Sequence, residues 1–94
     1  MRESAKVSTP PGSLHTSVSG GKSNEATSEY ASVSGGRFNT ASGYYASVSG
    51  GEDNIASGNY ASVNGGELND ASHSYSSILG NYNKATSSDH DTVW

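Results

Sequence analysis

The 94-residue sequence predicts an all-β fold, a parallel β-solenoid of about five coils with 15 residues in each coil. Two observations carry this prediction. Five residue types (Val, Tyr, Asn, Ala and Gly) recur at a fixed step of 15 residues, and glycine pairs stand at the same place in successive periods. A single Phe, a single Trp and a single Met are too few large apolar residues for an ordinary globular core. A fixed sequence period is typical of repeat architectures.

The repeats occupy four main columns, each named here by its residue type. The valine column contains Val18, Val33, Val48, Val63 and Ile78, and Val93 continues it. The asparagine column contains Asn24, Asn39, Asn54 and Asn69, and the tyrosine column contains Tyr30, Tyr45, Tyr60 and Tyr75. The first glycines of the pairs are Gly20, Gly35, Gly50 and Gly65. The columns predict ladders of identical residues stacked along the solenoid.

The composition alone is typical of a flexible linker. The chain contains 20 serines and 12 glycines, and only 31% of it is hydrophobic. Chains of this kind usually remain disordered. Linkers rarely hold several residue types in one register, so the repeat favours a folded structure over disorder.

Segment 1–15 is predicted to be a flexible lead or an imperfect cap, because it contains Pro10-Pro11-Gly12 and shows no register. The solenoid is predicted over 16–94, open at its C-terminal end. The last full period departs from the pattern, with Asn81 in place of the second glycine, Lys84 in the asparagine column and His90 in the tyrosine column.

Each period is predicted to form a short strand, a glycine turn, a second short strand and a further turn. In the first strand, Ala31 and Val33 alternate with Ser32 and Ser34, so the apolar residues can point inward. The second strand places Ala41 inward. Paired glycines in every period disfavour a helix, because each costs about 1 kcal/mol there relative to alanine.

Stacked coils are expected to place identical residues about 4.8 Å apart. The asparagine column is expected to form an inter-coil amide ladder, and the tyrosine column a stack of rings. The interior of Val and Ala is thin, so we expect coils of different chains to associate side by side and bury part of the tyrosine and valine columns.

Several partner and location classes are disfavoured. No apolar run reaches the length of a membrane-spanning helix, so this segment is not expected to insert into a membrane. No secretory signal follows the N-terminal residues Met1–Val7. The net charge of −4 argues against a nucleic-acid surface, and the absence of cysteine excludes disulfides. No cofactor is expected.

Candidate reactive sites are weak. Asp89-His90-Asp91 could bind a metal, but one histidine between two carboxylates is more typical of a solvated turn. The remaining histidines, His15 and His73, form no motif, and no catalytic residue is predicted. The glycine pairs are turn residues, because no phosphate-binding loop motif accompanies them.

The tyrosine column has two interpretations, a structural stack or an exposed strip for protein or glycan contact. The residues after the glycine pairs vary in charge and indicate an exposed edge; they are Lys22, Arg37, Glu52 and Glu67. The serine columns suggest a further, disfavoured reading as an ice-binding surface, because threonine is the better residue for it.

The repeat resembles the head repeats of trimeric autotransporter adhesins, the YadA-like head. Residues Ser32, Val33 and Gly36 match the first part of that family's pattern, and Ala41 and Gly43 match its second part. The next period matches with Ser47, Val48, Gly51, Ala56 and Gly58, and the likeness covers about 16–94. The period here is one residue longer, and asparagine replaces one alanine of the family pattern.

The resemblance implies a left-handed parallel β-roll assembled as a homotrimer. It implies a non-enzymatic adhesion module at the cell surface, the head segment of a longer outer-membrane protein that binds host matrix proteins, glycans or other surfaces. An alternative is a structural repeat segment of a phage tail fibre or similar shaft. A carbohydrate-active solenoid enzyme ranks last, because the acidic residues form no carboxylate column.

Overall fold

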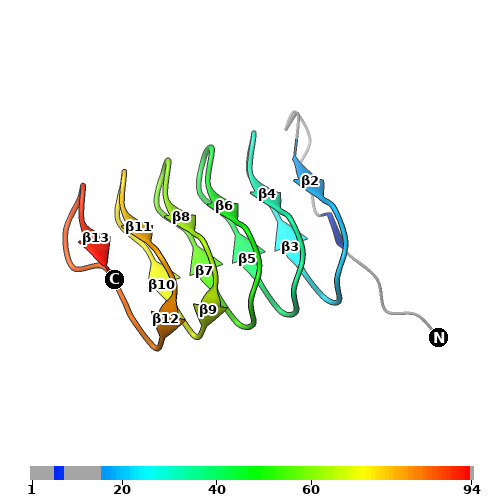
Figure 1. Cartoon of the computed structure of the whole chain (residues 1–94). Coiled ribbons are helices and arrows are strands. Elements are labelled where there is room, and N and C mark those ends of the chain that lie inside the picture. The colour runs from blue at the N-terminus through cyan, green and yellow to red at the C-terminus, as the bar shows by residue number, and fades with distance from the viewer. Residues whose placement is uncertain (1–5, 8–15, 94) are drawn as a thin grey trace.

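The chain folds as an all-β solenoid of about five coils, as the sequence predicts (Figure 1). The computed structural model describes residues 6–7 and 16–93. Within these residues every regular element is a strand of two residues, and none is a helix. Accordingly, no described segment forms a helix that could span a membrane.

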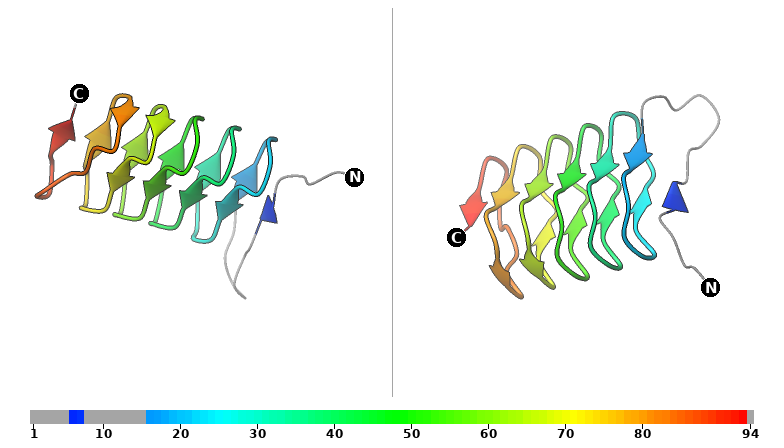
Figure 2. Two further views of the ribbon diagram at one scale, coloured as in Figure 1. Left: turned by 90° about the horizontal axis from the view of Figure 1, so that it is seen from below. Right: turned by 45° about the vertical axis from the view of Figure 1, so that its right-hand side comes forward.

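Three parallel ladders make up the walls of the solenoid. The first sheet contains β1 (Lys6–Val7), β3 (Glu25–Ala26), β5 (Thr40–Ala41), β7 (Ile55–Ala56) and β10 (Asp70–Ala71). The second contains β2 (Ser17–Val18), β4 (Ser32–Val33), β6 (Ser47–Val48), β8 (Ser62–Val63), β11 (Ser77–Ile78) and β13 (Thr92–Val93). The third contains β9 (Gly66–Glu67) and β12 (Asn81–Tyr82). The chain alternates between the first two sheets as it ascends, which is visible in both views of Figure 2.

The third ladder was not expected from the sequence, which predicts only a glycine turn there. Isolated parallel bridges extend it from β9 back through the preceding coils, joining Lys22 to Arg37, Arg37 to Glu52, and Glu52 to Glu67. The segment after each glycine pair is therefore hydrogen-bonded to the coil above and below it. This edge of the solenoid is a regular wall rather than a loose loop.

Strand register follows the sequence period. Val33 pairs with Val48 in the second sheet, and Ala41 pairs with Ala56 in the first. The pair Lys6 and Glu25 breaks this step, because β1 lies alongside β3 at a larger sequence separation. The described part of the expected lead or cap, β1, thus continues the first sheet; the rest of segment 1–15, including His15, and Trp94 lie outside the described residues.

The apolar side chains buried in the described part of the solenoid are all small or branched, and each is fully buried. They are Ala26, Ala31, Val33, Ala41, Ala46, Val48, Ala56, Ala61, Val63, Ala71 and Ile78, with Val18 and Val93 packed partly buried against them. The predicted alternation is confirmed, since Ala31 and Val33 are buried while Ser34 is exposed. Such a narrow interior agrees with a molecule only 12 Å across in its thinnest dimension.

The two glycines of each pair have different roles. A Cβ atom on Gly36 would lie 2.2 Å from the carbonyl oxygen of Gly51, and the φ angle of Gly36 is +91°. A Cβ atom on Gly35 would meet nothing within 4 Å. The sequence marks the first glycine of each pair as a ladder position, but the close backbone approach between coils requires the second.

Candidate functional site

The most continuous exposed feature is a stack of five aromatic rings, called here the aromatic stack: Tyr30, Tyr45, Tyr60, Tyr75 and His90. Consecutive ring centroids lie 4.5, 4.9, 4.9 and 4.9 Å apart, and the ring planes are parallel within 5°. The sequence treats His90 as a departure from the tyrosine column, whereas the structure places its ring on Tyr75 as the last member of the stack. The stack therefore extends over every coil from Tyr30 to His90.

The stack is held by turns in an unusual backbone conformation. All five residues have a left-handed φ, between 59° and 63°. This conformation costs an L-residue with a bulky side chain about 1–2 kcal/mol. The turns are tied to their neighbours by backbone hydrogen bonds, such as that from the N–H of Tyr60 to the carbonyl of Tyr44 at 2.7 Å. Ring stacking, worth about 0.5–1.5 kcal/mol per pair beyond burial, offsets part of the conformational cost.

The stack presents ring edges to solvent rather than ring faces. The tyrosines are 40–55% exposed, yet each inner ring has a parallel neighbour on both faces. One interpretation of the sequence is an exposed aromatic strip; the structure shows a ridge of ring edges, with one ring from each coil. Such a ridge suits contacts along an extended partner better than stacking of a sugar ring on an aromatic face.

Tyr44 lies beside the stack in a different orientation, which the repeat pattern does not predict. Its ring is nearly perpendicular to those of Tyr30 and Tyr45, at interplanar angles of 87° and 85°. A hydrogen bond to Glu29 and the charge of that carboxylate raise the pKa of Tyr44 above its ordinary value. The pKa of Tyr45 is also raised, first by partial desolvation of the phenol and then by Tyr30 and Tyr60.

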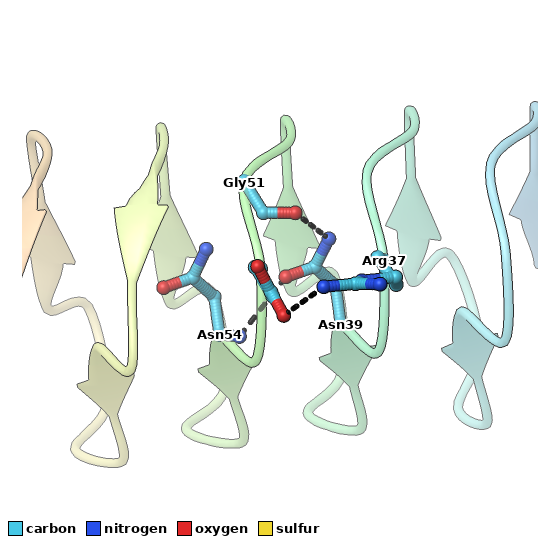
Figure 3. Close-up of polar contacts among 5 residues, drawn as sticks. Arg37, Asn39, Gly51 and Asn54 are labelled. Carbon is cyan, nitrogen blue, oxygen red and sulfur yellow. Dashed lines mark hydrogen bonds and ion pairs between the residues drawn. The ribbon is translucent and has the colours of Figure 1, made fainter.

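The asparagine column lies inside the solenoid and is structural. Each of Asn24, Asn39 and Asn54 is fully buried. The Nδ2 of Asn39 donates to the carbonyls of Gly35 at 3.0 Å and Gly51 at 2.9 Å, and its Oδ1 accepts from the N–H of Asn54 at 2.9 Å (Figure 3). The amides thus bond to backbone groups and not to one another, which differs from the expected side-chain ladder.

The edge formed by the third ladder carries four charged residues, one after each glycine pair: Lys22, Arg37, Glu52 and Glu67. Arg37 and Glu52 form an ion pair there, with side chains 50% and 36% exposed (Figure 3). A shallow groove of about 710 Å³ runs along this edge. Its lining consists of Gly36, Arg37, Gly51, Glu52, Gly66, Glu67 and Tyr82. The groove is open and mixed in charge, and its floor is glycine backbone.

The residues around His90 do not converge on a common point. The Asp89 carboxylate accepts a hydrogen bond from the N–H of Ser74 at 3.1 Å, and the Asp91 carboxylate accepts one from the N–H of Ser87 at 2.9 Å. Among residues 6–7 and 16–93, no three His, Cys, Asp or Glu side chains are grouped as metal ligands. His73 contacts Thr86, with 3.3 Å between Nδ1 and Oγ1.

The structure brings the tyrosine column together at the surface, and it places the valine and asparagine columns inside. Comparison of the chain with protein-family models, with curated proteins and with solved structures gives no match.

Proposed function

We propose that the chain is a non-enzymatic surface-contact module, comparable to the head segment of a trimeric autotransporter-like adhesin. The observation that carries the proposal is the aromatic stack, an exposed ridge of rings continuous over successive coils. Exposed tyrosines on a rigid frame lose little conformational entropy on binding, and tyrosine is enriched where binding energy concentrates in interfaces.

The repeat geometry favours an extended protein ligand over a compact one. Ring edges follow one another at 4.5–4.9 Å, so a partner chain or fibre lying along the solenoid can contact several coils at once. Contacts of this kind add up along the ridge, as in multivalent binding. A matrix protein is therefore the first ligand class, and a glycan with several exposed apolar faces is the second. A cell-surface position, within a longer outer-membrane protein, belongs to the same proposal.

Association of three chains is part of the proposal and rests on exposed apolar area. Besides the stack, Phe38, Ile55 and Leu68 are 40–47% exposed, whereas the buried apolar side chains of the described solenoid are all Val, Ile or Ala. Burying some of this surface between chains would stabilise each one. Sedimentation over a wide concentration range tests this, with a folded monomer at every concentration as the contrary result.

The binding test uses paired variants that share one backbone conformation. Tyr45→Asn with Tyr60→Asn removes two ring edges from the stack. The control pair, Ser23→Asn with Asp53→Asn, lies at positions with the same left-handed φ, 57° and 56°, and outside the apolar surface proposed for chain association. Asparagine suits this conformation, as Asn83 shows with φ 55°.

Both double variants and the parent are assayed on immobilised collagen and fibronectin after circular dichroism has shown equal β content. We expect the tyrosine pair to weaken binding by tenfold or more and the control pair to have a small effect. Equal binding by all three proteins, or binding by none, would contradict the proposal.

A stiff shaft segment is the second candidate. It is supported by the backbone ladders on three walls and by the buried asparagines, which resist bending between coils. A folded protein that binds none of the immobilised surfaces but forms a rod of constant rise per coil would favour this role.

A further inference from the structure

We propose that the tyrosines of the aromatic stack are an oxidative cross-linking site, at which a one-electron oxidant joins successive coils through dityrosine. The oxidant class is a haem peroxidase acting with hydrogen peroxide. The chain contains no cysteine, so this reaction gives it a covalent link between coils that disulfides cannot provide. The proposal does not depend on the ligand of the stack.

The ring geometry matches the geometry of the coupling reaction. In a tyrosyl radical the unpaired electron occupies π orbitals perpendicular to the ring, with density on the oxygen and the two ortho carbons. Tyr30 and Tyr45 are parallel within 2° at 4.5 Å, so these orbitals point from one ring toward the other. The pairs Tyr45–Tyr60 and Tyr60–Tyr75 repeat the arrangement at 4.9 Å. Reactants held with aligned orbitals gain a large effective concentration.

The tyrosines are also accessible to an oxidant. Tyr30, Tyr45, Tyr60 and Tyr75 are 40%, 41%, 47% and 55% exposed. Oxidation requires only electron and proton removal at the exposed edge and does not require the oxidant to enter the stack. When the first tyrosyl radical forms, the neighbouring ring with which it couples therefore already lies stacked against it.

The reaction balances as follows. Each of two phenols loses one electron and one proton, and the two radicals form a carbon–carbon bond between their ortho carbons. The hydrogen on each of those carbons then moves to the phenol oxygen, which restores both aromatic rings. Hydrogen peroxide accepts the two electrons and two protons and becomes two water molecules.

The same geometry predicts which tyrosines react with each other. Tyr44 is perpendicular to both Tyr30 and Tyr45, so its π orbitals do not face theirs. His90 closes the stack on Tyr75 without a phenol, so coupling along the stack ends at Tyr75. The expected products are therefore Tyr30–Tyr45, Tyr45–Tyr60 and Tyr60–Tyr75.

The sequence allows these products to be separated cleanly. Cleavage after Lys, Arg and Glu places the four tyrosines of the stack on four different peptides, 30–37, 38–52, 53–67 and 68–84. Tyr44 shares a peptide with Tyr45, and Tyr82 shares one with Tyr75, so fragment ions assign the linked residue in those two peptides. The full chain, dilute enough to suppress contacts between molecules, is treated with horseradish peroxidase and limiting hydrogen peroxide. Dityrosine fluorescence measures the yield, and mass spectrometry identifies joined peptides that have lost two hydrogen atoms.

Three proteins complete the experiment. Tyr45→Phe with Tyr75→Phe keeps the rings but leaves no neighbouring pair of phenols in the stack, and we expect at least a tenfold loss of yield. Tyr44→Phe is the matched control and should keep the parental yield and the same three linked pairs. The parent unfolded in urea should give a lower yield with scrambled pairs.

The proposal is overturned if native and unfolded protein give the same pattern of linked peptides. It is equally overturned if Tyr44→Phe lowers the yield as much as the double variant, because the stacked geometry would then not direct the coupling.

Discussion

The side-chain oxygen of Asn39 accepts a hydrogen bond from the backbone N–H of Asn54, one coil further along the chain, at 2.9 Å. With the two bonds donated by its Nδ2, this side chain satisfies three backbone groups in two coils. Replacing Asn39 by alanine removes the hydrogen-bond partner of the Gly35 carbonyl and of the Asn54 N–H, while the Gly51 carbonyl still accepts a hydrogen bond from the N–H of Arg37 at 2.9 Å. Each unsatisfied buried group costs about 1–3 kcal/mol.

We therefore expect Asn39→Ala to lower the free energy of unfolding by about 3 kcal/mol or more. Urea denaturation followed by circular dichroism measures the loss. Ser49→Ala, at an exposed position, serves as the control and should change stability by less than about 0.5 kcal/mol. Equal midpoints for the two variants would show that the buried amides contribute nothing to coil stacking.

The asparagine column is interrupted at Lys84, and restoring it should stabilise the protein. The backbone N–H of Lys84 already donates to the Oδ1 of Asn69 at 3.0 Å, so the main chain there has the geometry of the column. In Lys84→Asn the new amide can donate to the carbonyl of Gly80, as each earlier asparagine does four residues back. We expect a gain of about 0.5–1 kcal/mol, and Lys84→Ala, which adds no donor, should show none of it.

The glycine pairs offer a sharp contrast between neighbours. In Gly36→Ala the new methyl group collides with the carbonyl of Gly51 at a left-handed φ, so the two coils must separate locally. We expect a loss of several kcal/mol or failure to fold. In Gly35→Ala the methyl group points into open space, and reduced freedom of the unfolded chain should make the change neutral or stabilising by up to about 1 kcal/mol. Thermal melting of both variants checks the order.

Stability should fall at alkaline pH through the phenols beside Glu29. The pKa values of Tyr44 and Tyr45 are raised above their ordinary value of 10.0 in the folded chain. The folded state therefore holds these protons more tightly than the unfolded state does. The stabilisation that these two phenols contribute is fully present below pH 10.0, the ordinary pKa of tyrosine. It is lost as the pH rises through their raised pKa values in the folded chain. Urea midpoints measured from neutral pH to above that range should decline less steeply for Tyr44→Phe with Tyr45→Phe.

The ion pair between Arg37 and Glu52 should contribute little. Both side chains are more than a third exposed, and solvent screens such pairs to about 0–1 kcal/mol. We expect Glu52→Gln to change the free energy of unfolding by less than about 1 kcal/mol, with the difference shrinking further in high salt. A larger effect that survives salt would indicate a structural role for this pair in the third ladder.

The periodic residues allowed the solenoid, its inward alanines and valines, and the tyrosine stack to be predicted, because one residue type in one register has few ways to pack. The third ladder could not be predicted, since Lys22, Arg37 and Glu52 share no side-chain type, and only their backbones pair. The different structural roles of Gly35 and Gly36 could not be predicted for a related reason. Both are glycine in the sequence, and only the φ angle and the distance to the next coil distinguish them.

For the candidate site, the column of tyrosines indicated stacking but not which part of each ring would face solvent. That depends on the left-handed turns, which tyrosine rarely occupies and which no local sequence signal marks. The orientation and raised pKa of Tyr44 likewise depend on its contacts with Glu29 and Tyr45 in the folded chain. Tyr44 belongs to no column of repeated tyrosines, so the repeat pattern does not predict them.

The fifth period lacks both the asparagine and the second glycine, and this difference determines the order in which the coils unfold locally. Lys84 and Asn81 occupy those places, so the fifth coil contributes no asparagine side chain of its own to the column, although the backbone N–H of Lys84 still donates to the Oδ1 of Asn69. In a one-dimensional array each interface is held only by its neighbours, and the weakest interface opens first. We therefore expect the backbone amides of residues 80–90 to exchange with solvent first and the more central coils to follow in order. The amides around Asn39 and Asn54 should exchange last.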